Sequence, residues 1–244
     1  MTPVARRVVD RPLRSTHRLS NPSSRSLPWL ASARAPQVTE NGRKASIAAA
    51  RRRGDAAHAG HVGDEQAARS FLGDADPEVR ASALGALVRM NRATAADSAA
   101  ALADPDPRTR RRACEMGAAL PGADFSTLLE DPDRSVVEAA CFAVGEVSDA
   151  LALPALVRIA STHTDALCRE SAVAALGAIG SLEGLPAILA GLEDKPQIRR
   201  RAVIALAAIE SPESDAALRG CLTDRDWQVR QAAEDLLGVT TGDD

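Results

Sequence analysis

Asp74-Ala75-Asp76-Pro77-Glu78-Val79-Arg80-Ala81-Ser82-Ala83-Leu84 is the stretch that decides the fold of this chain, because close variants of it occur five more times. The copies align on the usually apolar residue that precedes the arginine, here called the anchor. The six anchors are Val79, Thr109, Val136, Cys168, Ile198 and Val229. Their successive spacings of 30, 27, 32, 30 and 31 residues are typical of stacked supersecondary units.

Each anchor begins a helical pattern. An alanine stands four residues after every anchor, as Ala83 does after Val79, and an apolar or small residue follows eight positions after it. These positions share one face of a helix. An Asp/Pro turn signal before each anchor ends one helix and caps the next. Each unit is therefore predicted to contain an A helix, a turn and a B helix that carries the anchor. The A helices are predicted at 64–72, 95–103, 123–130, 151–160, 183–192 and 213–222. The B helices are predicted at 77–90, 107–119, 134–146, 166–179, 196–209 and 227–237.

Charge divides the chain into two parts. The formal net charge is −3, but residues 1–53 hold twelve basic and two acidic residues, whereas residues 54–244 hold 18 basic and 31 acidic residues. An acidic repeat body argues against nucleic-acid binding by the repeats. Weak contact with nucleic acid through the basic tail stays open. The predicted organisation is a disordered basic tail (1–42), a first helix (43–63), a repeat domain (64–239) and an acidic tail (240–244).

The basic tail has three competing interpretations. Its arginines and serines, with few acids, are typical of an organelle transit peptide. It is also consistent with a tail that binds acidic surfaces, or with upstream sequence included by the choice of start site. Nothing after residue 43 depends on it.

The repeats resemble HEAT repeats, in particular the short HEAT-like repeats of phycobilisome lyases. In the first unit the resemblance is carried by Leu72, Asp74, Asp76-Pro77, Val79-Arg80, Ala83 and Leu87. The last unit repeats it as Leu222, Asp224, Asp226, Val229-Arg230, Ala233 and Leu237-Gly238. The match covers about residues 64–238 and implies an all-α fold, a right-handed α-solenoid of the armadillo type with about six helical hairpins.

Aspartates and arginines recur in register. In HEAT-like repeats such residues pair within and between units, so the resemblance implies a structural ladder here rather than an anion-binding strip. Its predicted members are Asp74, Arg80, Asp104, Arg110, Asp131, Arg169, Arg199, Asp224 and Arg230. The third unit has Val137 in place of the arginine and the fourth has His163 in place of the aspartate.

Catalytic motifs are not evident. The deoxyhypusine hydroxylases, which share HEAT-like repeats, build a di-iron site from His-Glu pairs, and this sequence has no His-Glu pair. His58 and His61 are interpreted as a solvated helix end rather than a metal site. A HEAT-like class of DNA glycosylases relies on aromatic residues and a basic face, which an acidic body with Trp227 as its only tryptophan does not offer. No cofactor is predicted. The sequence favours a non-catalytic protein, with enzyme function left open.

Four cysteines, Cys114, Cys141, Cys168 and Cys221, lack the paired spacing of a zinc site or a disulfide framework. They are predicted to be packing thiols in a reducing compartment, and the cytoplasm is the expected location. No apolar run approaches the roughly 20 residues that a membrane-spanning helix requires.

The predicted binding surface is the concave face, which the B helices of helical solenoids usually line. Positions two and six residues after each anchor are the exposed candidates there. The partner-binding candidates are Arg111, Glu115, Glu138, Phe142, Glu170, Arg200 and Ile204. Phe142 is either an anchor for a peptide or domain or a residue that tilts into the core. The predicted function is a non-catalytic scaffold or adaptor for an unidentified protein partner. The alternative is a bilin-lyase-like or other enzyme-accessory protein that handles a cofactor or modification.

Overall fold

The computed structural model describes residues 40–239, so the predicted acidic tail and residues 1–39 of the predicted basic tail lie outside the described residues. The described chain consists of helices, turns and loops. Its α-helices are α1 (Glu40–Val62), α2 (Glu65–Ser70), α3 (Pro77–Arg89), α4 (Ala95–Leu102), α5 (Pro107–Cys114), α6 (Arg134–Glu146), α7 (Leu153–Thr162), α8 (Ala166–Ile179), α9 (Leu185–Gly191), α10 (Pro196–Leu206), α11 (Pro212–Gly220) and α12 (Trp227–Leu237). The 3₁₀ helices are η2 (Gly117–Ala119), η3 (Ser126–Glu130), η4 (Ala150–Ala152), η5 (Leu182–Gly184) and η6 (Cys221–Thr223).

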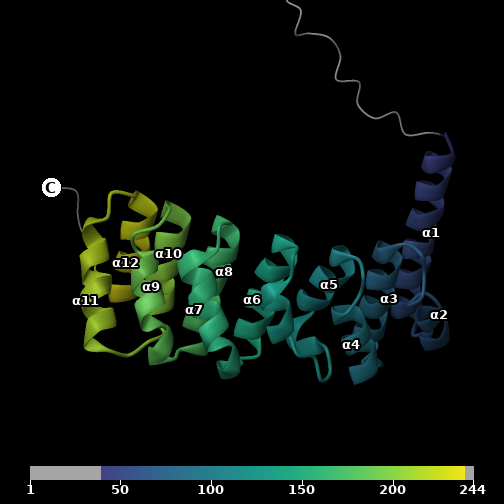
Figure 1. The fold of residues 1–244 in the computed structure, drawn as a ribbon, viewed down its shortest axis with the longest axis horizontal. Helices are drawn as coiled ribbons and strands as arrows, with labels where there is room; N and C mark the ends of the chain where they lie inside the picture. Colours follow the sequence, from purple (N-terminus) through teal and green to yellow (C-terminus); the bar gives the residue numbers. More distant parts are fainter. Residues whose placement is uncertain (1–39, 240–244) are drawn as a thin grey trace, which may run out of the picture. The chain divides into compact units, whose positions relative to one another are not determined.

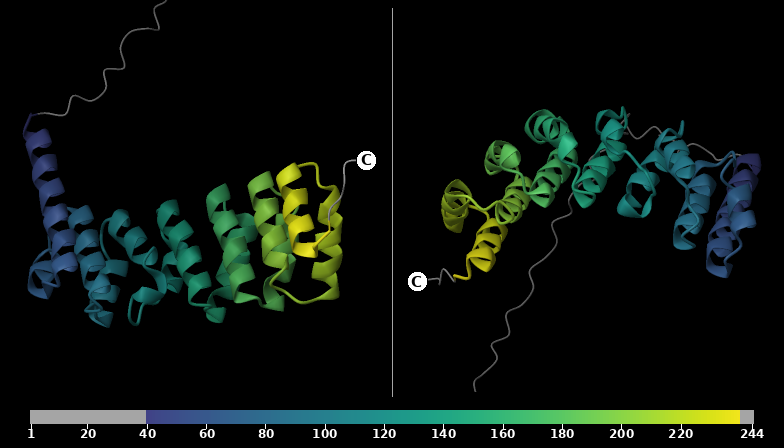
Figure 2. Two further views of the ribbon diagram at one scale, coloured as in Figure 1. Left: turned by 180° about the vertical axis from the view of Figure 1, so that it is seen from behind. Right: turned by 90° about the horizontal axis from the view of Figure 1, so that it is seen from below.

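The helices stack in chain order, each unit against the next (Figure 1). Figure 2 shows the two rows that result in the second half of the array, where the A helices α7, α9 and α11 form the outer row. The B helices α8, α10 and α12 form the inner row of the curve. The predicted all-α solenoid is therefore confirmed.

Aspartates start five of the B helices. The side chain of Asp76 accepts a hydrogen bond from the Glu78 backbone N–H at 2.9 Å, and the same cap recurs at the start of α5, α6, α8 and α12. Such a cap satisfies a backbone donor that the first turn of a helix leaves free. The exception is α10, whose N-cap Lys195 makes no side-chain cap.

Small residues bring neighbouring B helices close together. A Cβ atom added at Gly145 of α6 would lie 2.9 Å from the Cα atom of Ala175 in α8. One added at Gly177 of α8 would lie 2.7 Å from the Cα atom of Ala205 in α10. The B helices therefore meet along backbone-to-backbone contacts, which suits their position on the inner side of the curve.

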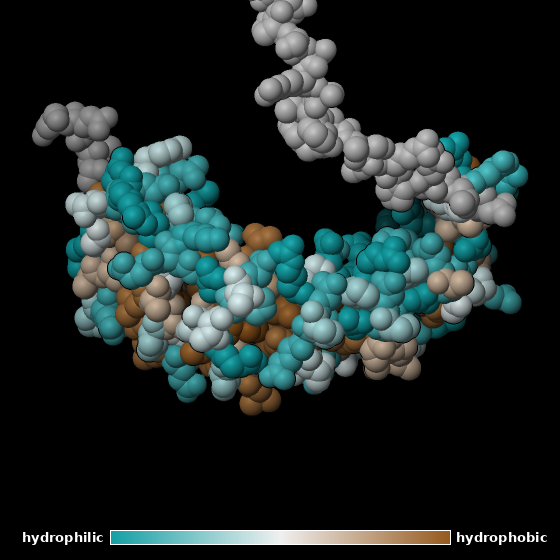
Figure 3. All heavy atoms as spheres, turned by 45° about the horizontal axis from the view of Figure 1, so that its top comes forward, coloured by the Kyte–Doolittle hydropathy of each residue, from teal (hydrophilic) through white to brown (hydrophobic). Residues whose placement is uncertain are grey.

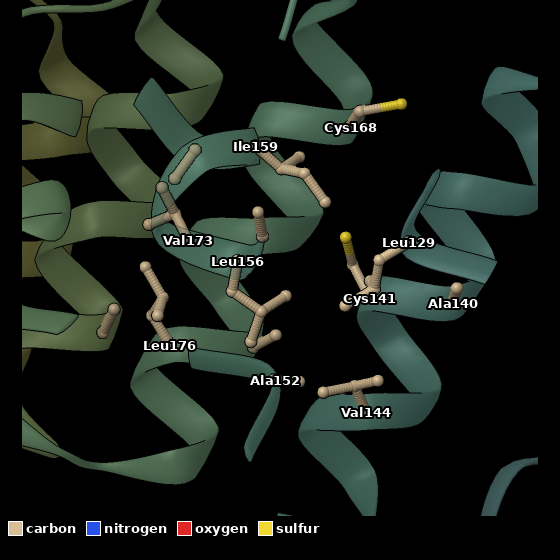
Figure 4. Close-up of a cluster of buried hydrophobic side chains, with 14 of the residues drawn as sticks. Leu129, Ala140, Cys141, Val144, Ala152, Leu156, Ile159, Cys168, Val173 and Leu176 are labelled. Atoms are coloured by element: carbon tan, nitrogen blue, oxygen red, sulfur yellow. The ribbon is translucent and has the colours of Figure 1, made fainter. Parts of the chain in front are cut away.

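The repeated apolar residues form the core. All six anchors and all six alanines that follow them are buried. In the middle of the array, Cys141 and Val144 of α6 point toward Leu156 of α7, and Val173 of α8 lies on its other side (Figure 4). Burying such side chains is the main favourable term in folding.

The four cysteines are buried free thiols. Burial raises the pKa of Cys114 and of Cys141 to about 12, and that of Cys168 to about 11. All three side chains are therefore neutral thiols at physiological pH, the form that packs as a small apolar group.

The second and third units depart from the predicted helices. The B helix predicted at 107–119 ends at Cys114, because Gly117 adopts a φ of 49° and the chain continues as a 3₁₀ turn. This positive φ favours glycine, and a Cβ atom at Gly117 would lie 1.7 Å from Oε2 of Glu146, whose exposed side chain would have to move. The A helix predicted at 123–130 is likewise the 3₁₀ helix η3.

Candidate functional site on the inner face of the B helices

The aspartates and arginines of the repeat form ion pairs between successive units. Arg80 of α3 donates to both carboxylate oxygens of Asp104, at 2.8 and 2.6 Å. Arg110 binds Asp131 in the same bidentate way, at 2.7 and 2.9 Å. Each arginine also donates to a backbone carbonyl of its own unit, as Arg80 does to Asp74 O at 2.8 Å. These arginines are therefore engaged in joining units.

The same arrangement continues toward the C-terminal end. Arg169 pairs with Asp194 at 2.7 Å and Arg199 pairs with Asp224 at 2.9 Å. The hydrogen bond from Arg199 lowers the pKa of Asp224 despite its burial, so the pair stays ionised. Arg230 donates to the backbone carbonyl of Asp224 at 2.8 Å.

Two members of the ladder were missed by sequence reasoning. Asp194 lies four residues before its anchor, whereas the other ladder aspartates lie five before theirs, so the shorter turn hid it. Arg52 of α1 binds Asp74 at 2.7 and 3.0 Å, but it is the middle residue of three arginines and nothing around it resembles the repeat. Its distance of 28 residues from Arg80 was the available signal. Through this bond α1 takes the place of a B helix that precedes the first unit.

Val137 and His163 are the two positions where the ladder pattern is broken. They belong to the same rung, which here means the arginine position of one unit and the facing aspartate position of the next unit. Val137 occupies the arginine position of the third unit and is buried, and His163 occupies the facing aspartate position of the fourth. His163 Nδ1 accepts a hydrogen bond from the backbone N–H of Asp165 at 3.1 Å, as Asp104 does from Asp106 N at 2.8 Å. The histidine thus keeps the turn while the ion pair is replaced by an apolar residue. An exposed Arg134–Asp165 ion pair links the same two units.

Two of the predicted partner-binding residues neutralise each other. Arg111 of α5 pairs with Glu115 at 2.8 Å, and Arg112 pairs with the same carboxylate at 3.0 Å. These side chains are exposed, so the pairs contribute little to stability. The surface of α5 therefore offers no strong unpaired charge at these positions.

Phe142 lies on the surface beside a groove. Its side chain is 60% exposed, so it does not tilt into the core. Together with Glu170 and Ala174 of α8 and Arg201 of α10, it lines a groove of about 370 Å³ that lies between α6 and α8 and reaches α10. Glu138 lies one helical turn before Phe142 on the same face of α6.

A second groove lies between α10 and α12. It has a volume of about 330 Å³ and is lined by Ile204 and Arg200 of α10 and by Trp227, Asp235 and Leu236 of α12. Trp227 is 63% exposed. The prediction named Ile204 and Arg200 but not Trp227, which lies two residues before its anchor and so falls outside the positions considered.

Apolar side chains reach the surface along the whole described array, from Ile47 in α1 to Val239 after α12. Figure 3 shows such brown atoms among hydrophilic neighbours on one face. Leu151 is 91% exposed in the connection between α6 and α7, and Leu182 is exposed in the equivalent connection between α8 and α9.

Residues 40–239 contain no group of three or more histidine, cysteine, aspartate or glutamate side chains placed to hold a metal ion. None of their helices combines the length and the apolar character needed to span a bilayer.

Comparison with known proteins adds a family and a fold. The HEAT repeats family matches residues 122–202 and 183–238. A search of curated proteins found no match. Two engineered proteins have similar solved structures: one is 20% identical with a TM-score of 0.54, the other 21% identical with a TM-score of 0.52. Each match covers 72% of this chain, which spans 57% of the first engineered protein and 97% of the second.

A natural complex is also similar. The structure of the complex of CpcE and CpcF of phycocyanin lyase from Nostoc matches with 26% identity and a TM-score of 0.53. The match covers 71% of this chain and 76% of that one.

The stacked hairpins and their inter-unit ion pairs define an α-solenoid. The family match identifies residues 122–238 as HEAT repeats. In architecture the chain is similar to the two engineered proteins and to the lyase complex.

Proposed function

We propose that this protein is a protein-interaction scaffold that binds its partner on the inner face of the B helices α6, α8, α10 and α12. The observation that supports the proposal most strongly is Phe142, a large apolar side chain that is 60% exposed beside a groove. Exposed aromatic side chains next to pockets are typical of the residues that dominate binding energy in protein interfaces. Arg80, Arg110, Arg169 and Arg199 of the ladder are engaged in ion pairs and Arg230 donates to a backbone carbonyl, which leaves the grooves as the distinctive feature of this face.

The compartment is part of the proposal. Four buried free thiols suit a reducing environment, and we place the protein in the cytoplasm. The partner is a protein of that compartment.

The scaffold is tested by capturing partners from the native cell. The bait variant combines Phe142→Ala, Glu138→Arg and Glu170→Arg, and the matched control is Leu151→Ala, which removes an exposed apolar side chain in the α6–α7 connection. We expect wild-type protein and the control to capture the same partner, and the triple variant to lose it. Retention of every partner by the triple variant would contradict binding at the inner face. Circular dichroism of each bait checks that it is folded.

The second candidate is an accessory role in attaching or handling a bilin. Its support is the 26% identity to the CpcE–CpcF complex of phycocyanin lyase. The groove beside Phe142, at about 370 Å³, lies at the lower end of the volumes typical of small-molecule sites. Purified protein mixed with free bilin gives the test: a shifted and intensified bilin absorption band supports this role, and an unchanged spectrum excludes it.

A further inference from the structure

The inner face carries two grooves along the row of B helices. The first groove lies between α6 and α8, and the second lies between α10 and α12. Both open along the same row of helices, where α8 packs directly against α10. This pair of grooves gives the proposed function a more specific form, and the inference below rests on that function.

The first groove has unmet polar requirements. The Nε atom of Arg201 is buried there without a hydrogen-bond partner, although its guanidinium lies 3.5 Å from Glu170. A buried donor without a partner costs free energy. Rotation of the Arg201 side chain, which is 42% exposed, would bring this donor to a bound acceptor such as a peptide carbonyl oxygen.

Acidic groups dominate the charge of this first groove. Arg201 already faces Glu170, and Glu138 makes no ion pair with any described residue. The groove and its edge therefore carry a net negative charge around an apolar surface formed by Phe142 and Ala174. A ligand that complements it has an apolar side chain with a basic neighbour.

The second groove is apolar with balanced charge. Trp227, Ile204 and Leu236 supply its apolar surface, and Arg200 and Asp235 supply one charge of each sign. It suits a second large apolar side chain and sets no requirement for the charge of the neighbouring residue.

The separation of the grooves determines how far apart two apolar side chains of one ligand must be to fill both grooves. Packed helices lie about 8–10 Å apart. The apolar part of the first groove, between α6 and α8, is two helix-to-helix steps from the second groove, so the two apolar surfaces are roughly 16–20 Å apart. An extended peptide advances about 3.3 Å per residue. Two side chains that fill both grooves are therefore about five or six residues apart.

We propose that the inner face binds one extended peptide segment of a partner protein that carries two large apolar residues five or six positions apart. A lysine or arginine stands beside the apolar residue that enters the groove at Phe142. A backbone carbonyl of the segment accepts the hydrogen bond from Arg201 Nε.

A displayed library of random 14-residue peptides tests this inference with the full-length protein. We expect the enriched peptides to share two large apolar residues five or six positions apart with a basic residue beside one of them. Enrichment of peptides that lack this spacing, enrichment of acidic peptides, or no enrichment would overturn the inference.

Variants of the protein then test which groove binds each apolar residue of the best enriched peptide. Phe142→Ala and Trp227→Ala are each expected to weaken its binding by about tenfold or more, as expected for anchor residues, and Leu151→Ala is expected to leave it unchanged. Replacing the basic residue of the peptide by glutamate should weaken binding to wild-type protein and should have a smaller effect on a Glu138→Arg variant. Equal binding by all variants would overturn the assignment to the grooves.

The inference and the proposed function fail in different ways. If native partners depend on Phe142 but enriched peptides show no spacing, the inner face binds a folded surface and only the two-groove inference is wrong. If neither partners nor peptides depend on Phe142, the proposed function itself is wrong.

Discussion

Replacing Arg199 by valine tests how the ladder joins units, because the chain already contains the replacement that should restore stability. Arg199 is 3% exposed and donates to Asp224 Oδ2 at 3.0 Å, to Asp224 Oδ1 at 2.9 Å and to Asp194 O at 3.0 Å. The Arg199→Val variant leaves the Asp224 carboxylate without its cation.

The expected loss follows from what remains after the change. Removing one partner of a buried ion pair typically costs 3–5 kcal/mol. Asp224 is partly accessible to water and still accepts a hydrogen bond from Asp226 N at 2.7 Å, so we expect the lower end, about 3 kcal/mol. For a domain of this size, about 3 kcal/mol lowers the Tm by roughly 6–12 °C.

The double variant Arg199→Val/Asp224→His copies the natural rung of Val137 and His163. The new histidine can accept from Asp226 N as His163 does from Asp165 N, and no charge is left buried. We expect the double variant to lie within about 1–2 kcal/mol of wild type.

Thermal unfolding followed by circular dichroism at 222 nm measures the Tm of wild type and of each variant. Asp224→His alone is the control, because it leaves Arg199 without its carboxylate partner. A double variant no more stable than Arg199→Val would refute the view that Val137 and His163 are one compensated rung.

Three further predictions concern packing, pH and the thiols. Gly177→Ala should lower the free energy of unfolding by about 1–3 kcal/mol, because the new Cβ atom would meet the backbone of Ala205. Gly54→Ala in α1 has open space around the new Cβ atom and should raise the free energy of unfolding by about 0.5–1 kcal/mol. Urea titration of both variants measures the two changes. The hydrogen bond from Arg52 lowers the pKa of Asp74 to about 2, so the stabilisation by the Arg52–Asp74 pair is present above the ordinary aspartate pKa of about 4 and is lost as pH falls toward 2. Asp74→Asn should therefore flatten the fall in Tm between pH 4 and pH 2, and an unchanged slope would contradict this role of Asp74. Burial raises the pKa of Cys141 to about 12, so native protein should react with a thiol reagent at pH 7.5 only as fast as it opens, and immediate labelling would show that the core is not closed.

The repeats determined how much of the fold the sequence could predict. A six-fold pattern of anchor, alanine and Asp/Pro turn specifies buried faces and caps, and five of the six predicted B helices occur within a few residues of their expected bounds. The helix predicted at 107–119 was wrong beyond Cys114 because its end depends on Gly117 lying against Glu146, a contact between units that local pattern does not encode.

The site was harder to predict than the fold. Positions two and six residues after the anchor placed Phe142, Glu170, Arg200 and Ile204 on the inner face, since helical periodicity fixes which side chains point outward. The grooves also depend on Trp227 at the start of α12 and on the close approach of neighbouring B helices. Those features follow from stacking and not from the pattern within one unit.

The most direct test of the central claim is site-specific photo-crosslinking in the native cell, with p-benzoylphenylalanine placed at position 142 in one strain and at position 151 in another. Both native side chains are exposed and apolar. Comparing the two positions therefore distinguishes specific binding at the inner face from non-specific contact with any exposed apolar side chain. The account predicts a discrete crosslinked partner at position 142 and none at position 151. Crosslinking of a partner at position 151 without any at position 142 would contradict it.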